Sequence, residues 1–258
     1  MDIFAYKSIA ASAWRSNVPV GSTAGPRNGL IEARTMLSAT VEDYLKHIYL
    51  LEQADVDNPV AMGHLATTVG VAPGTATAMI KTLANAQLVD YEPRGGVRLT
   101  STGQQMALHV VRRHRLVELL LVEVLRLDWS LVHHEAEQLE HAISDIVLEK
   151  IDALLEYPTV DPHGDPIPTA KGHLEYVQPV SLTDCKPGQQ GHITRVSDQN
   201  TQFLQFAERH RLTPGMGITI DAYDKYGDAV TVSPKHCDPV TLGTNAASKI
   251  FVALPKDP

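Results

Sequence analysis

Apolar side chains along residues 40–85 recur with the period of helices. The first set repeats every three to four positions: Val41, Tyr44, Leu45, Ile48 and Leu51. Thr40 stands where it can cap the start of this helix. A second helix is predicted over 62–69, between a break at Pro59 and a stop at Gly70, and a third begins near Pro73, because proline suits a first helical turn.

The third predicted helix has two distinct faces. The inward face carries Ala76, Met79, Ile80 and Leu83, and the outward face carries Gly74, Thr77, Ala78 and Lys81. Two short strands follow at 88–91 and 97–100, joined across 93–96 by a turn rich in proline and glycine. Helix, turn, helix and hairpin in this order predict a winged helix-turn-helix.

Longer helices are predicted next. A possible capping box of Ser101 and Gln104 opens a helix that reaches about Leu127. Between 116 and 127, apolar residues occupy nearly every side of this helix. Such a helix is buried, and we expect its partner to be a second subunit. A further helix is predicted over 130–155, with Leu139, Ile143, Ile146 and Val147 on one face. Prolines then end the helical region at 158, 162, 166 and 168.

From Val177 onward the pattern is that of β-structure. Strand-like segments at 191–196, 217–223, 229–233 and 247–254 are separated by turns, with one helical stretch at 202–210. We therefore predict a mainly α protein with a small SH3-like barrel as its β C-terminal domain. The expected division is a flexible N-terminal arm at 1–37, a winged helix-turn-helix at 38–105, a metal-binding and dimerisation domain at 106–160, a Pro-rich linker at 161–176 and the barrel at 177–256.

Composition narrows the possible functions. The chain has 258 residues, a formal net charge of −8 and two cysteines, Cys185 and Cys237. Two cysteines exclude a disulfide scaffold, and the negative charge argues against binding a polyanion through bulk charge. No apolar stretch approaches the roughly 20 residues of a membrane helix, so a cytoplasmic protein without membrane contact is expected.

Histidine and glutamate gather in one part of the chain. Glu137, Glu140 and His141 follow one another at helical spacing, and His114 and Glu118 do the same on the preceding helix. Imidazole and carboxylate without thiolate suit Mn(II), Fe(II) or Zn(II). Acidic helix faces with scattered histidines are also common on solvated surfaces, so the spacing alone leaves both interpretations open.

Patterns that would indicate an enzyme are missing. Neither Glu118 nor Glu137 has the histidine three residues later that a diiron bundle requires, and the zinc-protease patterns also fail at His141. The sequence contains no Gly-rich phosphate loop and no Gly-x-Ser-x-Gly elbow. A metal-dependent enzyme on a helical bundle is kept as the alternative from another class.

Three long motifs give the chain a family resemblance. They are Val-Arg-Arg-His-Arg-Leu-Val-Glu at 111–118, Val-His-His-Glu-Ala-Glu-Gln-Leu-Glu-His at 132–141 and Asp-Pro-His-Gly-Asp-Pro-Ile-Pro at 161–168. Together with the winged helix they resemble the diphtheria toxin repressor family over about 37–254. The resemblance implies a homodimeric, metal-dependent transcriptional repressor that binds operator DNA, with two dimers per operator, a FeoA-like barrel and control of metal-uptake genes.

The resemblance also implies two metal sites. The primary site would use Asp43, Glu137, Glu140 and His141. The ancillary site would use His114, Glu118 and His133, with candidate barrel ligands Asp198, Gln199 and Gln202.

Two departures from the family bear on the ion. Iron-responsive members carry Met and Cys where this chain has Asp43 and Glu137, so hard oxygen donors favour Mn(II), with an Fe(II)-responsive repressor as the alternative. Co(II) or Zn(II) can substitute. Lys46 replaces a glutamate that bridges two ions in short manganese repressors, which favours two separate sites.

Small and hydroxylated side chains are expected at the DNA interface. The candidates are Ala72, Pro73, Thr75, Thr77, Lys81 and, at the wing tip, Arg94. Because no Arg, Asn or Gln faces outward early in this helix, direct base contacts should be few and DNA shape should contribute to specificity. Acidic residues outnumber basic ones in both 38–105 and 106–160, so a bound cation would relieve repulsion from phosphates. His163 is expected to be an ordinary turn residue.

Overall fold

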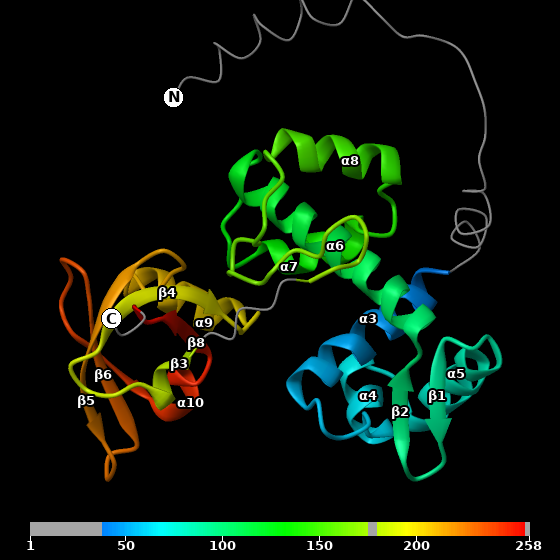
Figure 1. The fold of residues 1–258 in the computed structure, drawn as a ribbon, viewed down its shortest axis with the longest axis horizontal. Coiled ribbons are helices and arrows are strands. Elements are labelled where there is room, and N and C mark those ends of the chain that lie inside the picture. The colour runs from blue at the N-terminus through cyan, green and yellow to red at the C-terminus, as the bar shows by residue number, and fades with distance from the viewer. Residues whose placement is uncertain (1–37, 175–179, 256–258) are drawn as a thin grey trace, which may run out of the picture. The chain divides into compact units, whose positions relative to one another are not determined.

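The structure is a computed structural model that describes residues 38–174 and 180–255 (Figure 1). The predicted N-terminal arm at 1–37 lies outside the described residues, as does the predicted junction between linker and barrel at 176 and 177. Among the described helices, none combines the length and apolar character needed to cross a membrane.

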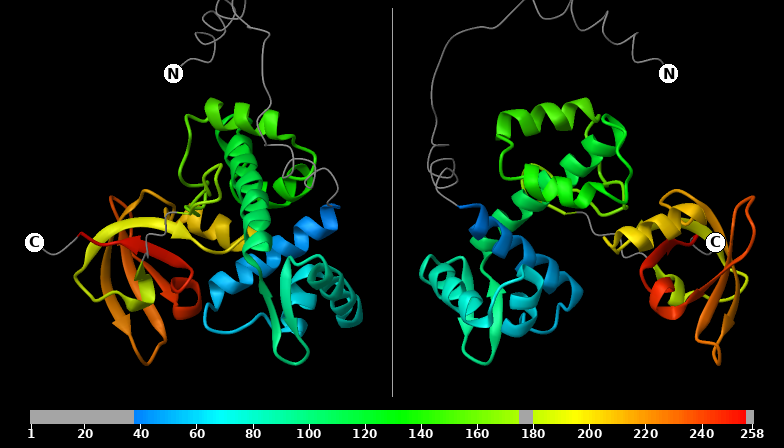
Figure 2. Two further views of the ribbon diagram at one scale, coloured as in Figure 1. Left: turned by 45° about the vertical axis from the view of Figure 1, so that its right-hand side comes forward. Right: turned by 180° about the vertical axis from the view of Figure 1, so that it is seen from behind.

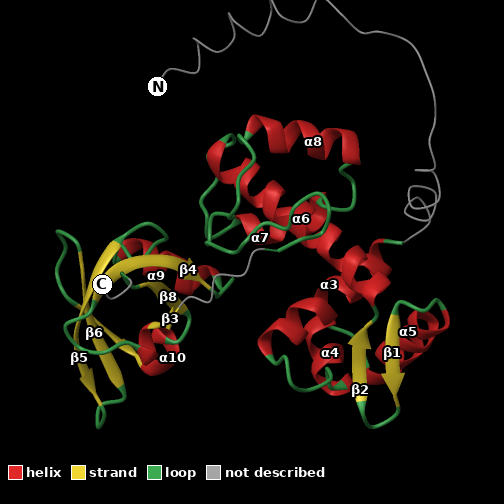
Figure 3. Ribbon diagram, in the orientation of Figure 1, coloured by secondary structure: helices red, strands yellow, loops and turns green. Residues whose placement is uncertain are grey.

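A winged helix-turn-helix occupies the N-terminal part of the described chain. Its elements are α3 (Ala39–Ala54), α4 (Met62–Val69), α5 (Pro73–Asn85), β1 (Val89–Glu92) and β2 (Gly96–Leu99). The predicted cap at Thr40 is wrong, because Ser38 caps α3 by accepting a hydrogen bond from the Val41 amide. Gly70 ends α4 with φ 74°, a left-handed conformation that glycine adopts without strain. The two strands pair antiparallel, with Val89 opposite Leu99 (Figure 3).

Helix α6 (Ser101–Glu123) follows the wing directly. The predicted capping box is wrong: Thr100 is the cap, and its side chain accepts from the Gly103 amide. The helix is also shorter than predicted, since Arg126 adopts a left-handed φ of 61° just beyond its end. Helix α3 packs against α6, as both views of Figure 2 show, so the winged helix is attached directly to the helix that carries His114 and Glu118.

The single helix predicted over 130–155 is wrong, because the structure has two helices there. They are α7 (Val132–Leu139) and α8 (Asp145–Leu154). Ser144 separates them, since its side chain accepts from the Val147 amide and starts α8. Glu140 forms the C-cap of α7, and His141 lies in the following turn. The break therefore places two expected ligands at a helix end.

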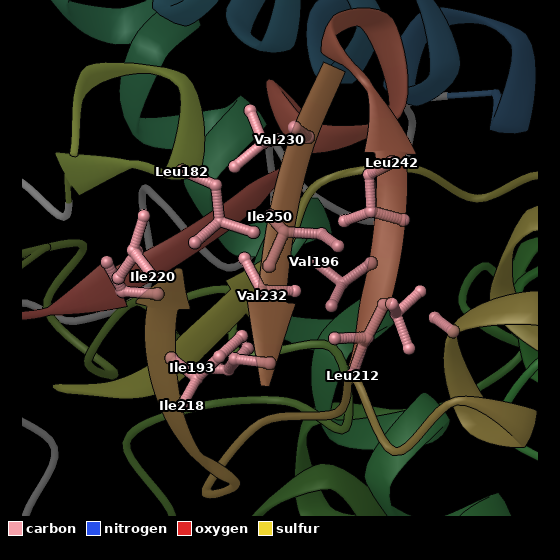
Figure 4. Packing of buried hydrophobic residues seen from close by; sticks show 14 of the residues in the cluster. Leu182, Ile193, Val196, Leu212, Ile218, Ile220, Val230, Val232, Leu242 and Ile250 are labelled. Carbon is pink, nitrogen blue, oxygen red and sulfur yellow. The ribbon is translucent and has the colours of Figure 1, made fainter. Parts of the chain in front are cut away.

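The C-terminal domain is the predicted SH3-like β-structure. Its strands are β3 (Val180–Ser181), β4 (Gln190–Val196), β5 (Gly217–Asp224), β6 (Ala229–Pro234), β7 (Val240–Gly243) and β8 (Ile250–Ala253), in the order β3-β8-β4-β5-β6-β7. A 3-10 turn (Leu182–Asp184) and two helices, α9 (Thr201–Arg209) and α10 (Thr244–Ala247), complete it. The strand predicted at 247–254 begins only at Ile250, because α10 ends at Ala247. Buried aliphatic side chains such as Ile193, Val232 and Ile250 fill the interior (Figure 4).

Candidate metal centre

Three of the four residues expected at the primary site converge. Asp43 lies on α3, and Glu140 and His141 lie at the end of α7. His141 Nε2 is 2.8 Å from Asp43 Oδ1 and 3.4 Å from Glu140 Oε1. One ligand atom from each residue lies within 4.8 Å of the others. This group can hold a divalent ion through two oxygens and one nitrogen.

Two residues that the sequence analysis missed orient His141. His141 Nδ1 is 2.7 Å from Glu42 Oε2, and the other oxygen of Glu42 accepts a hydrogen bond of 2.5 Å from Arg113. A histidine that binds a metal through Nε2 commonly donates its Nδ1–H to a carboxylate, which fixes the ring. Glu42 directly precedes Asp43 and Arg113 directly precedes His114, and these positions beside predicted ligands are the sequence feature that could have identified them.

Glu137 does not join this first group. Its Oε1 lies 2.7 Å from the Lys46 ammonium, which is also 2.6 Å from Glu140 Oε1. Lys46 is 2% exposed, and although burial lowers its pKa, the two carboxylates raise it overall. Burial raises the pKa of Glu137, but the Lys46 charge outweighs this and lowers it. An ammonium group thus lies between the two carboxylates, and Glu137 instead groups with Glu140 and His114.

The three helical residues expected at the ancillary site converge as well. His114 Nε2 is 3.0 Å from Glu118 Oε1 and 3.1 Å from His133 Nδ1. His133 Nδ1 is 3.2 Å from the same glutamate oxygen. Burial lowers the pKa of His114, but the Glu118 charge and hydrogen bonds to Glu118 and Glu140 raise it to about 9. The pKa of Glu118 is lowered, because its contacts with His114 and His133 outweigh the effect of burial.

A short contact joins the two groups. His114 Nδ1 is 2.6 Å from Glu140 Oε2, so Glu140 faces the first group with one oxygen and the second with the other. Glu140 is 0% exposed and Glu118 is 1% exposed. Buried carboxylates need a cationic partner, which Lys46 supplies to Glu140 and His114 to Glu118 when no metal is bound. The nitrogen and oxygen donors, with no thiolate among them, fit an ion such as Mn(II) or Fe(II).

The candidate barrel ligands do not contact this centre through any hydrogen bond or ion pair of the described residues. Asp198 accepts a 2.6 Å hydrogen bond from Lys249 within the barrel. Gln202 is exposed on α9. Gln199 Oε1 is buried without a hydrogen-bond partner. Asp198 therefore already has a cationic partner, whereas Gln199 retains a free oxygen.

His163 lies in a turn, as expected, but it is buried rather than an ordinary exposed turn residue. It is 0% exposed, and its Nε2 lies 3.0 Å from the Trp129 carbonyl oxygen. The segment around it holds further buried charge at Asp161 and Asp165. Burial, with the nearby carboxylates of Asp165 and Glu118, raises the pKa of Asp161 well above its usual range.

The expected DNA-binding residues lie on the outside of α5 and at the wing tip. Ala72, Pro73, Thr75 and Lys81 are exposed, and Thr77 is half-buried. Thr77 Oγ1 donates to the Pro73 carbonyl at 2.8 Å, so its hydroxyl proton is already used within the helix. Arg94 is exposed in the hairpin turn with a left-handed φ of 69°. The opposite face of α5 is buried at Ala76, Ile80 and Leu83.

The apolar run of α6 is largely buried within the chain itself. Leu116, Val117 and Leu121 are at most 4% exposed and pack against α7, α8 and the loop at 167. For these three residues the expectation that a second subunit covers the helix is wrong, because α7, α8 and the loop at 167 already bury them. Large apolar side chains are exposed instead at the end of α6 and along α7 and α8: Val124, Leu125, Leu131, Leu139, Ile146, Val147 and Leu154.

Family models match three successive parts of the chain. Residues 36–97 match the N-terminal DNA-binding domain of iron-dependent repressors, and residues 100–169 match the metal-binding and dimerisation domain of the same proteins. Residues 180–254 match the FeoA domain.

The chain is also similar to individual proteins. An uncharacterised HTH-type transcriptional regulator of Methanocaldococcus jannaschii is 36% identical over 120 residues, which are 46% of this chain and 95% of that protein. The iron-dependent repressor IdeR of Mycobacterium leprae is 36% identical over 129 residues, which are 50% of this chain and 55% of that protein. A solved manganese-dependent transcriptional repressor in complex with manganese is 38% identical, with a TM-score of 0.77 over 83% of this chain and 99% of that chain.

Proposed function

The chain belongs to the diphtheria toxin repressor family of metal-dependent, DNA-binding transcriptional repressors, and from this premise we propose that Mn(II) is its activating ion. The family consists of regulators, which excludes the hypothesis of a metal-dependent enzyme. The proposed primary ligands are Asp43, Glu140 and His141, with Glu137 beside them. The proposed ancillary ligands are His114, Glu118 and His133. When bound, the ion supplies positive charge and directional coordination.

The contact between Asp43 and His141 carries this proposal. The two residues are 98 positions apart in the sequence, yet their side chains lie 2.8 Å apart. Asp43 belongs to the helix that opens the winged helix-turn-helix, and His141 follows α7 in the metal-binding part. An ion held by both residues ties the two parts together and favours the arrangement in which α5 can enter a major groove.

Charge explains why an ion should promote binding to DNA. Acidic side chains exceed basic ones both in the winged helix and in the helical part, so the metal-free protein repels phosphates. A dication bound to Asp43 and Glu140 cancels part of this charge without removing a residue from the DNA face. Lys81 and Arg94 then supply phosphate contacts, and Ala72, Pro73, Thr75 and Thr77 supply small contacts to the bases.

The donor atoms favour Mn(II) over Fe(II). Asp43, Glu140 and His141 offer oxygen and nitrogen, and no sulfur donor accompanies them in this group. Harder oxygen donors suit Mn(II), and softer thioether or thiolate donors suit later metals. Fe(II) is the second candidate because it shares the preference for imidazole, and iron-dependent repressors are among the similar proteins. Co(II) and Zn(II) can substitute for either ion.

The assembly that we propose is a homodimer in the cytoplasm, with two dimers on each operator. The match to a metal-binding and dimerisation domain supports the dimer. The exposed apolar residues of α8, Ile146 and Val147, supply a surface for it. We also infer control of metal-uptake genes and the division at 38–105, 106–160, 161–176 and 177–256. The order of the three matched domains supports this division, and the second match, 100–169, extends beyond 106–160 at both ends.

The test is operator binding as a function of metal concentration. A palindromic operator is first enriched from a random DNA library with Mn(II)-loaded protein, and binding is then followed by fluorescence anisotropy under anaerobic conditions. Asp43→Ala should require at least about tenfold more Mn(II) for half-maximal binding, because it removes one of three ligands at the bridge. Asp57→Ala, at an exposed position after the same helix, is the matched control. If Asp43→Ala needs no more Mn(II) than the wild type, the proposal that an ion links Asp43 to His141 is refuted. If only Fe(II) activates the wild type, the proposal that Mn(II) is the activating ion is refuted.

A second variant separates metal binding from DNA binding. Thr77→Asp places a carboxylate on the outer face of α5, where it would meet phosphates. It should abolish operator binding while calorimetry finds Mn(II) affinity unchanged. Retained operator binding would show that α5 is not the reading helix.

A further inference from the structure

A third group of potential ligands lies beside the ancillary site and shares Glu118 with it, whereas its other two members, Asp161 and His163, take no part in the proposed function. Glu118 of α6 is 1% exposed, Asp161 is 4% exposed and His163 is 0% exposed. One ligand atom from each lies within 4.8 Å of the others. Asp161 and His163 come from the Pro-rich segment after α8, so the group joins that segment to α6.

His163 presents an unpaired nitrogen to this group. Its Nε2 lies 3.0 Å from the Trp129 carbonyl oxygen, which can only accept, so Nε2 carries the proton and Nδ1 carries a lone pair. Nδ1 is buried and has no hydrogen-bond partner among the described residues. The ring also stacks on Trp129, with centroids 5.2 Å apart. Hydrogen bonding of one ring nitrogen to a backbone carbonyl is the usual arrangement of a metal-binding histidine.

The two carboxylates are held with one oxygen each still available. Asp161 Oδ1 accepts from the amides of His163 at 2.8 Å and Asp165 at 2.9 Å. Asp161 Oδ2 is 3.7 Å from Arg115 Nε, which is beyond an ordinary hydrogen bond. Glu118 Oε1 contacts His114 and His133, and Glu118 Oε2 lies 4.0 Å from His163 Nδ1.

The spacing fits one ion between these atoms. His163 Nδ1 and Glu118 Oε2 are both acceptors, too far apart to share a proton directly and with no donor between them. Two ligand atoms on opposite sides of an ion, each at about 2.2 Å, are separated by about 4.4 Å. The observed 4.0 Å is therefore compatible with shared coordination without movement of the main chain.

The neighbouring charges leave room for a cation. The Arg115 guanidinium lies 3.6 Å from Asp165 Oδ1, and that same oxygen is 2.8 Å from Arg195 Nε. Arg115 also lies 3.7 Å from Asp161 Oδ2, and His114 lies 3.0 Å from Glu118 Oε1. An added ion would therefore use the other oxygen of Glu118 and share the Asp161 carboxylate with Arg115. One imidazole and two carboxylates suit Mn(II), Fe(II) or Zn(II).

We propose that Glu118, Asp161 and His163 bind a further divalent ion, with Glu118 bridging it to the ancillary site. This site goes beyond the regulatory function proposed above. Its role is structural, because it fastens the Pro-rich segment and the turn at Trp129 to α6. Since Glu118 serves both groups, filling one of them orients the carboxylate for the other.

The test is the number of Mn(II) ions bound by the full chain, measured by equilibrium dialysis and elemental analysis. His163→Phe keeps a ring that can stack on Trp129 and removes the nitrogen, so it should bind one ion fewer than the wild type. His173→Gln, at an exposed position of the same segment, should bind as many ions as the wild type. Equal stoichiometry in the wild type and His163→Phe would overturn the site and assign a water molecule to it. DNA binding plays no part in this measurement, so a failure of the proposed regulatory function would not affect it.

A second variant guards against misfolding of the first. Asp161→Asn retains an oxygen that can accept the two amide hydrogen bonds and removes the ligand charge. It should also lose one ion while its circular dichroism spectrum and its metal-free melting temperature stay near those of the wild type. In both variants, Mn(II) should raise the melting temperature less than in the wild type. A folded Asp161→Asn with the full stoichiometry and the full metal-induced shift would refute the proposal independently of His163→Phe.

Discussion

Lys46 gives the sharpest prediction about the metal threshold. Its ammonium lies 2.7 Å from Glu137 and 2.6 Å from Glu140, and the side chain is 2% exposed. In the metal-free protein this charge compensates two carboxylates that would otherwise repel each other. It also opposes an ion at the Asp43 group, because that ion would share the same oxygen of Glu140.

The size of this opposition follows from the geometry. A Lys46 nitrogen and a metal ion bound to one carboxylate oxygen lie at most about 5 Å apart. Charges of +1 and +2 at that distance repel by about 1.7 kcal/mol in a water-like dielectric and by about 7 kcal/mol at an effective dielectric of 20. Each 1.4 kcal/mol is a factor of about ten in affinity. Even the lower limit predicts that Lys46→Met binds Mn(II) about tenfold more tightly than the wild type.

The assay is a calorimetric titration of Mn(II) together with metal-dependent operator binding, on Lys46→Met and on Lys150→Met as control. Lys150 is exposed on α8 and lies outside the ligand groups. Metal-free Lys46→Met should also be less stable by about 3–5 kcal/mol, since it leaves buried carboxylates without their partner, and Mn(II) should restore the loss. If folded Lys46→Met binds Mn(II) no more tightly than the wild type, Lys46 does not compete with the ion for Glu140. A weaker affinity would mean that Lys46 stabilises the metal-bound state.

Three further predictions concern the choice of metal ion, the dimer surface and the dependence of stability on pH. Glu137→Cys should shift the ratio of Fe(II) to Mn(II) concentrations needed for operator binding toward Fe(II), because thiolate is a softer donor than carboxylate; an unchanged ratio under anaerobic titration would contradict this. Ile146 is 74% exposed on α8, and Ile146→Glu should raise the dimer dissociation constant, measured by sedimentation, at least about tenfold. The control Glu149→Gln, on the same helix, should leave it unchanged. A wild type that is monomeric at micromolar protein concentration would contradict the proposed dimer surface. The pKa of His114 is raised to about 9, so the stability that its charge contributes is complete below about pH 6.5 and is lost as the pH rises through 9. Between these pH values, the metal-free wild type should therefore lose more stability than His114→Asn. The same dependence of melting temperature on pH in both proteins would contradict this.

Local sequence signals predicted most of the fold. The helix at Met62–Val69 begins and ends where Pro59 and Gly70 indicated, and Pro73 opens α5. The failure at 130–155 has a physical cause: the apolar period continues through the break, so periodicity alone cannot detect Ser144 capping a new helix. The capping errors at Thr40 and Ser101 are of the same kind, because several adjacent hydroxyl residues can each act as a cap and only the backbone conformation selects one.

The candidate site was predictable only in part. Helical spacing places Glu137, Glu140 and His141 near one another, because such neighbours are three or four residues apart. The ammonium of Lys46 between Glu137 and Glu140 depends on contacts across 91 and 94 residues, which no local pattern contains. The burial of His163 likewise depends on a contact with Trp129, 34 residues away.

The contact between His114 and Glu140 couples the two proposed metal sites. If an ion binds His114 through Nε2 at the ancillary site, the remaining proton of the ring must lie on Nδ1, which is 2.6 Å from Glu140 Oε2. That hydrogen bond fixes the Glu140 carboxylate, whose Oε1 lies 2.6 Å from the Lys46 ammonium and 3.4 Å from His141 Nε2. An ion at the ancillary site would therefore orient a proposed ligand of the primary site, which would lower the entropic cost of binding an ion there. If both proposed sites bind ions, this contact would couple the ancillary site on α6 to the primary site that includes Asp43 of α3, so each ion would favour the binding of the other.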